Sequence, residues 1–313
     1  MNQSEPTPPI PAVATPASRK RYAILAALTV VILCILFFQA RGSWGQLSRP
    51  HWGPLLAAVA LTALFLPCMT LRWVATLWAG RYPVTFREAA LASMAAWPLG
   101  TITPSKTGDL AKAFCVRHHA PLAAGLGSVA AERAMDVFML LLLCLYGGIV
   151  LQMLGIVIFA LLGLAGALTG SFIIMKAWRL PVGPKWQERL ASFRLTWHAM
   201  ARRPQYILLS GAGSLANWLL SIWQVQLLYR AYGCEVSLSF VCAALPVAVF
   251  IGLLPLTIAG MGTRDKTMMT LFAPYAPPAV SLSVGILYSI CGYWIPSLVG
   301  LPFMRRLLIS KSM

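Results

Sequence analysis

Apolar runs long enough to cross a lipid bilayer recur along almost the whole of this 313-residue chain. A helix needs roughly 20 apolar residues to span about 30 Å of hydrocarbon. Hydrophobic residues make up 59% of the chain and charged residues 11%, whereas about a quarter of the residues in a soluble domain are charged. The sequence therefore predicts an all-α, polytopic transmembrane helical bundle. Its six full spans are expected at 22–38, 53–78, 122–149, 154–175, 205–229 and 279–302.

The net charge of +17 is carried mainly by lysines and arginines that lie between the apolar runs. This pattern is typical of positive-inside anchoring and disfavours nucleic-acid binding, which needs a basic face on a soluble fold. We expect the basic loop 176–204 and both termini on the cytoplasmic side of a bacterial cytoplasmic (inner) membrane. Residues 1–18, rich in Pro, Ala, Ser and Thr, are expected to form a disordered cytoplasmic tail. A single transmembrane domain is expected over 19–308, followed by a short cytoplasmic tail at 309–313.

Two segments, 86–117 and 238–275, do not fit a simple span. Each has an apolar helix that we expect to end at a proline, then a glycine-containing break, an aspartate and a second short helix. Pro and Gly break helices at membrane depth, and the freed backbone groups need protein or water around them. We expect broken or re-entrant hairpins that enter from opposite faces as an inverted repeat; two ordinary kinked spans are the alternative. The expected break residues are Pro98, Gly108, Pro255, Gly260 and Gly262.

Charged residues in or beside the apolar segments are the strongest functional signal. A charge at the bilayer centre costs about 3 kcal/mol or more, so such residues usually face a bundle interior or a wet cavity. Glu132 and Asp136 share one helix face, and Arg133 can pair with Asp136. A cation from another helix, Arg264 or Lys106, is expected to complete the group. A structural salt-bridge network and a charged binding cavity both stay open as interpretations.

A new helix is expected to begin at each of two cations, Lys106 and Arg264, with Thr107 or Asp109 near the first N-cap and Thr263 near the second. Helix N-termini attract anions through free N–H groups and the helix dipole, so a cation beside one makes a phosphate site. Asp109 and Asp265 either cap these helices or balance the cations.

The predicted span 205–229 carries small and polar residues along one helix face. They either pack helices together or line a hydrophilic track for a lipid headgroup. The seven cysteines and four histidines show no metal-ligand spacing, so neither a metal nor a cofactor is expected. The stripe consists of Ser210, Ser214, Asn217, Ser221 and Gln224.

Three segments resemble the motifs of a known membrane family. They are PLGTITPSKTGDLAKAF, AAERAMDV and LPLTIAGMGTRD, which occur in this order. On this hydropathy the chain resembles, over roughly residues 20 to 305, the transmembrane region family of lysylphosphatidylglycerol synthases, also called flippase-like proteins. The resemblance carries the family's motif positions to Gly108, Asp109, Glu132, Arg133, Asp136, Gly260, Gly262, Arg264 and Asp265.

The resemblance implies that the membrane region moves a modified lipid between leaflets. Full-length synthases of the family add a soluble aminoacyl-transferase domain after the membrane region. This chain is expected to lack that domain and not to be an enzyme.

Residues and resemblance together predict a flippase or transporter for a lipid with a phosphate headgroup: a phospholipid, an aminoacyl-phospholipid or a polyprenyl-linked lipid. Two alternatives stay open. One is a membrane-embedded glycosyl- or acyltransferase, although the loop at 40–52 offers His51 without an acid and the loop near Tyr232 offers only Glu235. The other is a non-catalytic scaffold for a lipid-modifying enzyme, which would be its partner. The expected substrate-binding residues are Lys106, Asp109, Glu132, Arg133, Asp136, Asn217, Arg264 and Asp265.

Overall fold

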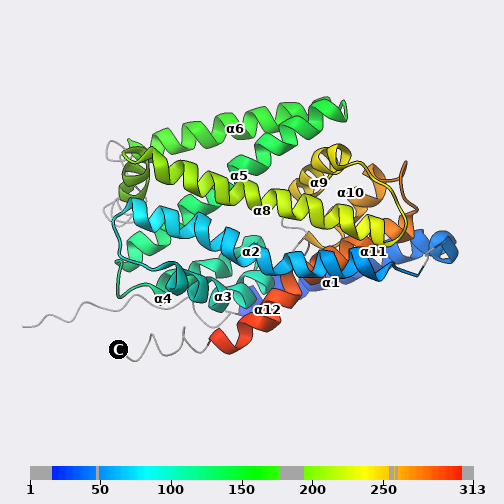
Figure 1. Ribbon diagram of the computed structural model, residues 1–313, viewed down its shortest axis with the longest axis horizontal. Helices are drawn as coiled ribbons and strands as arrows, with labels where there is room; N and C mark the ends of the chain where they lie inside the picture. The colour runs from blue at the N-terminus through cyan, green and yellow to red at the C-terminus, as the bar shows by residue number, and fades with distance from the viewer. Residues whose placement is uncertain (1–15, 47–48, 177–193, 254–256, 258–259, 305–313) are drawn as a thin grey trace, which may run out of the picture.

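The computed structural model of the protein describes residues 16–46, 49–176, 194–253, 257 and 260–304. Over these residues the secondary structure is helical, without β-strands (Figure 1). The elements are α1 (Pro16–Ala40), η1 (Arg41–Gln46), α2 (Trp52–Ala79), α3 (Phe86–Ile102), η2 (Pro104–Ala111), α4 (Lys112–Cys115), α5 (Leu122–Val150), α6 (Leu154–Met175), a helix over 194–201, α8 (Pro204–Ala231), α9 (Leu238–Gly252), α10 (Thr263–Leu271), α11 (Pro278–Ser289), the π-helical turn η5 (Ile290–Trp294), α12 (Ile295–Gly300) and η6 (Leu301–Met304).

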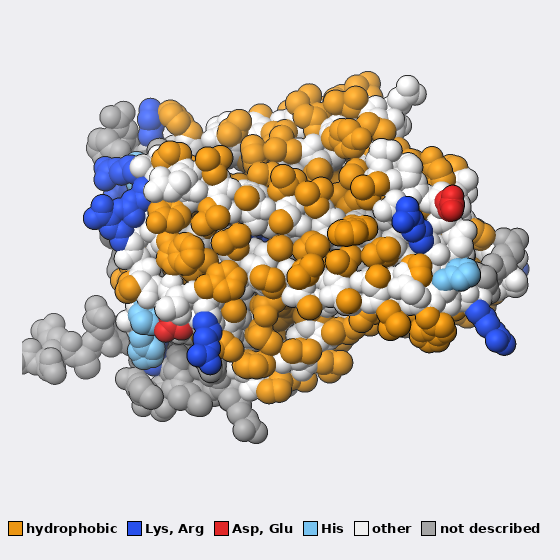
Figure 2. Space-filling model, viewed as in Figure 1, with side chains coloured by type: hydrophobic (Ala, Val, Ile, Leu, Met, Phe, Trp, Pro, Cys, Tyr) orange, Lys and Arg blue, Asp and Glu red, His pale blue; other side chains and the backbone are white. Residues whose placement is uncertain are grey.

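Six helices in the described part of the chain are long and apolar enough to cross a membrane. All six predicted spans are confirmed. On the face shown in Figure 2, charged side chains gather at the two ends of the long axis and apolar side chains cover the belt between them. The protein is therefore a multi-pass membrane protein. The apolar segments are Ala26–Gly45, Trp52–Ala79, Leu122–Val150, Leu154–Ile173, Pro204–Ala231 and Pro278–Met304.

α2 and α8 pack against each other in opposite directions along their lengths (Figure 1). The backbone N–H of His51, before α2, donates to the carbonyl of Ala231 at the end of α8. At the other end, the Arg203 guanidinium before α8 donates to the carbonyl of Ala79 over 3.2 Å. The helix pair is thus fastened at both ends.

The polar stripe on α8 faces α2 and α5. Ser210 donates to the carbonyl of Arg72 over 3.0 Å, and Gln224 donates to the carbonyl of Ala58 over 2.7 Å. These contacts favour the packing interpretation of the stripe. Ser214 is the exception, because its hydroxyl donates to the Asp136 carboxylate over 3.1 Å.

Gly213 marks the closest approach of α8 to α2. A Cβ added at this position would lie 3.0 Å from the Arg72 nitrogen and 3.1 Å from the Cys68 carbonyl oxygen. We expect Gly213→Leu to lower the stability by about 1–3 kcal/mol, because forced overpacking shifts backbone. The thermal midpoint of the purified protein would fall. The exposed neighbour Ala212 provides the control, and equal midpoints for Gly213→Leu and Ala212→Leu would contradict the prediction.

Both predicted breaks are present. α3 has 17 residues and α9 has 15, or about 26 Å and 23 Å at 1.5 Å per residue. Neither therefore covers the roughly 30 Å of a hydrocarbon core. α3 packs against η2 and α4, and α9 packs against α10. The two broken elements lie toward opposite ends of the long axis (Figure 1); an inverted repeat stays a prediction.

The break residues differ partly from those predicted. Pro98 lies inside α3, which ends only at Ile102, so the expectation that this helix ends at the proline is wrong. A proline deprives a helix of one hydrogen bond but can be accommodated where neighbouring groups satisfy the backbone. Gly260 and Gly262 have positive φ angles of 71° and 100°, which glycine adopts without a Cβ penalty. Pro255 lies outside the described residues.

Several sequence predictions fall partly outside the described residues. These are most of the N-terminal tail, the greater part of the basic loop and the C-terminal tail. α1 already begins at Pro16. The domain boundaries and the sidedness of the termini stay predictions.

Candidate functional site: two buried charge clusters

The Glu132 carboxylate on α5 lies buried between cations from two other helices. Arg72 of α2 donates to Glu132 Oε1 through Nε over 3.0 Å and through Nη2 over 2.9 Å. Lys112, the first residue of α4, donates to the other carboxylate oxygen. The Lys112 ammonium also lies 4.7 Å from the centre of the Trp73 ring. Each Glu132 oxygen therefore has its own cationic partner.

The charges continue outward along α5. Arg72 also binds Asp136 through Nη1. Arg133 binds Asp109 of η2, and its Nη1 lies 3.7 Å from Asp136 Oδ2. Each of these two carboxylates is thus bound to a guanidinium group, Asp136 to that of Arg72 and Asp109 to that of Arg133.

We call these six residues the α5 network. It contains three cations and three carboxylates, so it is neutral when all are ionised; such pairing is what makes burial of charge tolerable. Glu132 is fully buried, but the Arg133 and Asp136 side chains are 26% and 21% exposed. The network is therefore closed at its Glu132 end and accessible at its Arg133 end. Its members are Arg72, Asp109, Lys112, Glu132, Arg133 and Asp136.

Arg72 and Glu132 lie within two of the apolar spans and away from the helix ends. Arg72 is seven residues before the end of α2 and Glu132 is ten residues after the start of α5. At 1.5 Å per residue these positions are about 10–15 Å from the helix ends. Charges at this depth are expensive, so they indicate function or a strongly held structure.

A second group of charges, the α10 cluster, consists of Arg264 and Asp265 at the start of α10. Both are buried. Arg264 Nη2 donates to Asp265 Oδ1 over 2.6 Å, to the Gly285 carbonyl over 2.9 Å and to Ser289 Oγ over 2.7 Å. The other Asp265 oxygen accepts the backbone N–H of Gly262 over 2.9 Å. Asp265 therefore both caps α10 and balances Arg264.

Two glycines leave the space that the side chains of the α10 cluster occupy. A Cβ on Gly285 would lie 2.5 Å from Asp265 Oδ1, and a Cβ on Gly252 would lie 2.9 Å from Arg264 Cβ. Any side chain at Gly285 would displace the carboxylate that holds Arg264. The cluster therefore depends on α9, α10 and α11 packing with almost no space between them.

The last span packs against elements that carry both clusters. The π-helical turn η5 contacts α2, which carries Arg72, and Arg264 donates to the Gly285 carbonyl and the Ser289 hydroxyl of α11. The Arg264 guanidinium also lies 5.0 Å from the Tyr288 ring centre. Single π-turns in helices are frequent at functional sites.

Each cluster also holds an incompletely bonded guanidinium group. Arg133 Nε and Arg264 Nη1 are buried and have no hydrogen-bond partner among the described residues. Buried polar atoms are nearly always bonded, so such exceptions need an explanation. A planar guanidinium with a spare N–H suits a phosphate or carboxylate oxygen. Each cluster thus contains one cation with an unused donor.

The sequence placed the carboxylates correctly but did not identify two of their cationic partners. Glu132 and Asp136 do share a face, and Arg133 lies within ion-pair distance of Asp136. The completing cation is not Arg264, which binds Asp265. Its place is taken by Arg72 and Lys112. The side chain of the other candidate, Lys106, is outside the described part of the chain.

Arg72 was missed because a basic residue near the end of an apolar run is typical of a membrane interface. Its side chain is only 2% exposed. The signal that could have identified it is its position within the apolar span, seven residues before the end of α2. Lys266, by contrast, is exposed and donates to Gln39 of α1 over 2.9 Å.

Two other predicted residues can now be placed. Asp109 binds Arg133 and so balances a cation. Asn217 is half-buried on the α8 stripe between Ser214 and Ser221. Among the described residues, the structure does not join its side chain to either cluster.

The comparisons with known proteins agree on one membrane protein family. The family model described as "Lysylphosphatidylglycerol synthase TM region" matches residues 24–300. A UPF0104 membrane protein from Methanothermobacter thermautotrophicus is 24% identical over 286 residues, which cover 79% of this chain and 83% of that protein. A further UPF0104 membrane protein match from this organism is 29% identical over 91 residues, 29% of this chain and 27% of that protein. The family match includes both clusters.

Proposed function

Because the chain belongs to the family of lysylphosphatidylglycerol synthase transmembrane regions, we propose that it moves a lipid with a phosphate headgroup between the leaflets of the membrane. The observation that carries the proposal is the pair of buried guanidinium groups, Arg133 and Arg264, each with an unused donor. They come from α5 and α10, which belong to separate parts of the chain.

In this proposal the phosphate would bind to these two cations. Hydrogen bonds to charged groups contribute about 1.5–3 kcal/mol each, and a phosphate offers oxygens to both guanidinium groups. The carboxylates of Asp109 and Asp136 would hold Arg133 while the site is empty. They would also compete with the phosphate, which keeps its binding weak enough for release.

The broken helices would supply the movement. Non-helical backbone at membrane depth is tolerated where it is buried in protein or lines a wet cavity, and discontinuous helices form the substrate sites of many transporters. η2 carries Asp109 and the start of α10 carries Arg264. A shift of either broken element would therefore change the site directly. In this proposal, the end of the molecule from which the basic loop 176–204 extends faces the cytoplasm, as the positive-inside rule predicts.

Leaflet exchange in proteoliposomes tests the proposal. The purified protein would be reconstituted with labelled neutral, anionic, aminoacylated and polyprenyl-phosphate lipids, with and without a proton gradient. We expect exchange that depends on the headgroup. Arg133→Gln and Arg264→Lys should each lower it by about 10- to 100-fold, the loss of one charged hydrogen bond.

Lys266→Gln is the matched control, because Lys266 is a cation next to the α10 cluster whose side chain is exposed. Its exchange rate should equal that of the unaltered protein. Exchange of no lipid in any condition would refute transport. Exchange that persists in folded Arg133→Gln and Arg264→Lys would refute the proposed site. A scaffold would likewise tolerate all three changes once folding is controlled.

A further inference from the structure

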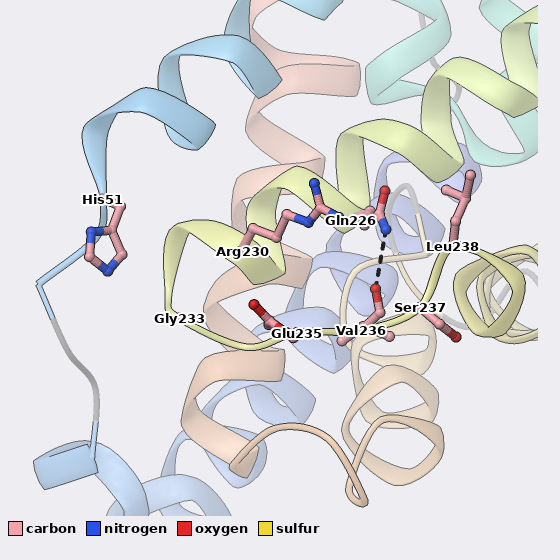
Figure 3. A pocket seen from close by; sticks show the side chains of 8 residues that line it. All are labelled: His51, Gln226, Arg230, Gly233, Glu235, Val236, Ser237 and Leu238. Atoms are coloured by element: carbon pink, nitrogen blue, oxygen red, sulfur yellow. Dashed lines mark hydrogen bonds between the residues drawn. The ribbon is translucent and has the colours of Figure 1, made fainter.

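A pocket of about 750 Å³ opens at the end of the molecule where α2 begins and α8 ends (Figure 3). It is remote from both charge clusters along the chain and is lined by residues from the His51 segment, the end of α8 and the loop that follows. Its volume falls in the range of about 300–1,000 Å³ that is usual for small-ligand sites. The polar lining residues are His51, Gln226, Arg230, Glu235 and Ser237.

The backbone of this pocket is firmly held. His51 is joined to the end of α8 through its backbone N–H, which donates to the Ala231 carbonyl over 2.7 Å. The buried Gln226 side chain donates to the Val236 carbonyl over 3.2 Å, the dashed line in Figure 3. Both ends of the 230–238 loop are therefore tied to α8 or α9. These hydrogen bonds hold the backbone of the pocket in place without a ligand.

Opposite charges line the pocket without neutralising each other. Arg230 lies in the last turn of α8 and Glu235 on the loop that passes beside it (Figure 3). Within the described residues, neither takes part in a salt bridge. Glu235 is also one of only eight acidic residues in a chain with net charge +17. A ligand with one anionic and one cationic group could bind both side chains at once.

Exposed apolar side chains lie at the pocket and beside it in sequence. Leu238 lines the pocket and is 47% exposed, and Trp52, next to His51, is 68% exposed. Exposed tryptophans favour the membrane–water interface. A ligand could therefore place its charged part in the pocket and an acyl chain along the adjoining apolar surface.

We infer that this pocket binds the zwitterionic headgroup of a phospholipid. The phosphate faces Arg230, and the ammonium faces Glu235. This site is separate from the two buried clusters and lies at the interface opposite the basic end. Binding here is measured without leaflet exchange, so the inference and the transport proposal can fail independently.

The test is photo-cross-linking in nanodiscs made of phosphatidylglycerol. The full chain would be exposed to a photoreactive phosphatidylethanolamine or, separately, to a photoreactive phosphatidylglycerol with the same acyl chains. We expect the ethanolamine lipid to label peptides covering 226–238 about fivefold more than the glycerol lipid, the selectivity of roughly one exposed ion pair. Glu235→Gln should abolish this preference, whereas Arg230→Gln should lower labelling by both lipids.

Arg41→Gln is the matched control, because Arg41 is an exposed cation in η1, outside the pocket. Its labelling should equal that of the unaltered protein. Equal labelling by the two lipids, or a preference unchanged in Glu235→Gln, would overturn the inference. An excess of soluble glycerophosphoethanolamine identifies the source of the headgroup. Persistent lipid labelling supports a membrane lipid, and complete displacement would mean that the pocket takes a free zwitterion instead.

Discussion

Arg72→Leu is expected to destabilise the protein more than any other single charge removal. The Arg72 side chain is buried and binds two carboxylates, Glu132 and Asp136. Its removal would leave the α5 network with a net negative charge in the membrane interior. Removing one partner of a buried ion pair lowers the free energy of unfolding by about 3–5 kcal/mol, because the remaining charge is uncompensated. The thermal midpoint and the yield of monodisperse protein should both fall sharply.

Two companion variants separate charge from packing. Adding Asp136→Asn to Arg72→Leu restores neutrality, so part of the lost stability should return. Arg72→Lys keeps the charge but loses the planar fork that binds both carboxylates, so its midpoint should lie between those of the unaltered protein and Arg72→Leu. If Arg72→Leu alone had an unchanged midpoint, the α5 network would not stabilise the fold.

Much of the fold could be predicted because it depends on local properties of the chain. Each span is recognisable as a run of about 20 apolar residues, and the second break is visible as Gly260 and Gly262 directly after an apolar run. The position of the helix ends was less predictable. α3 continues four residues past Pro98, which depends on how its neighbours satisfy the backbone.

The partners of the charges could not be predicted from local properties. Glu132 and Asp136 are four residues apart, so helix periodicity alone places them on one face. Their cations are 60 and 20 residues away from Glu132 in sequence, and helix periodicity does not determine which helices meet. Gly213 allows α2 to approach α8 closely, and Ser210 fixes the backbone at Arg72. Tertiary packing therefore selects Arg72.

The same packing would allow a neutral salt-bridge network and the proposed substrate site to share residues. The buried end of the α5 network, at Glu132, is saturated with cations. The partly exposed end, at Arg133, has an unused donor. The structural and functional interpretations of these charges thus apply to different ends of one network. On this view Arg72 and Lys112 fix the geometry, and Arg133 meets the ligand.

Gly108→Ala is expected to disrupt the first broken element and, with it, leaflet exchange. A Cβ on Gly108 would lie 2.2 Å from both the carbonyl carbon and oxygen of Leu99 and 2.6 Å from the Gly100 nitrogen. These are backbone atoms, so no side-chain rotation relieves the clash. η2 would have to move away from α3, and the hydrogen bond from the Gly108 N–H to Thr103 Oγ1 would be lost.

Because Asp109 directly follows Gly108, that movement would displace a member of the α5 network. Asp109 packs so closely on α3 that a Cβ on Gly100 would lie 2.1 Å from its carboxylate, and it is the partner of Arg133. We therefore expect Gly108→Ala to lower the thermal midpoint and reduce exchange at least as much as Arg133→Gln. Gly166→Ala in α6 is the control, because nothing lies within 4 Å of the added Cβ and alanine favours helix over glycine by up to about 1 kcal/mol. A Gly108→Ala protein with the midpoint and exchange rate of Gly166→Ala would show that the close contact between η2 and α3 is not required.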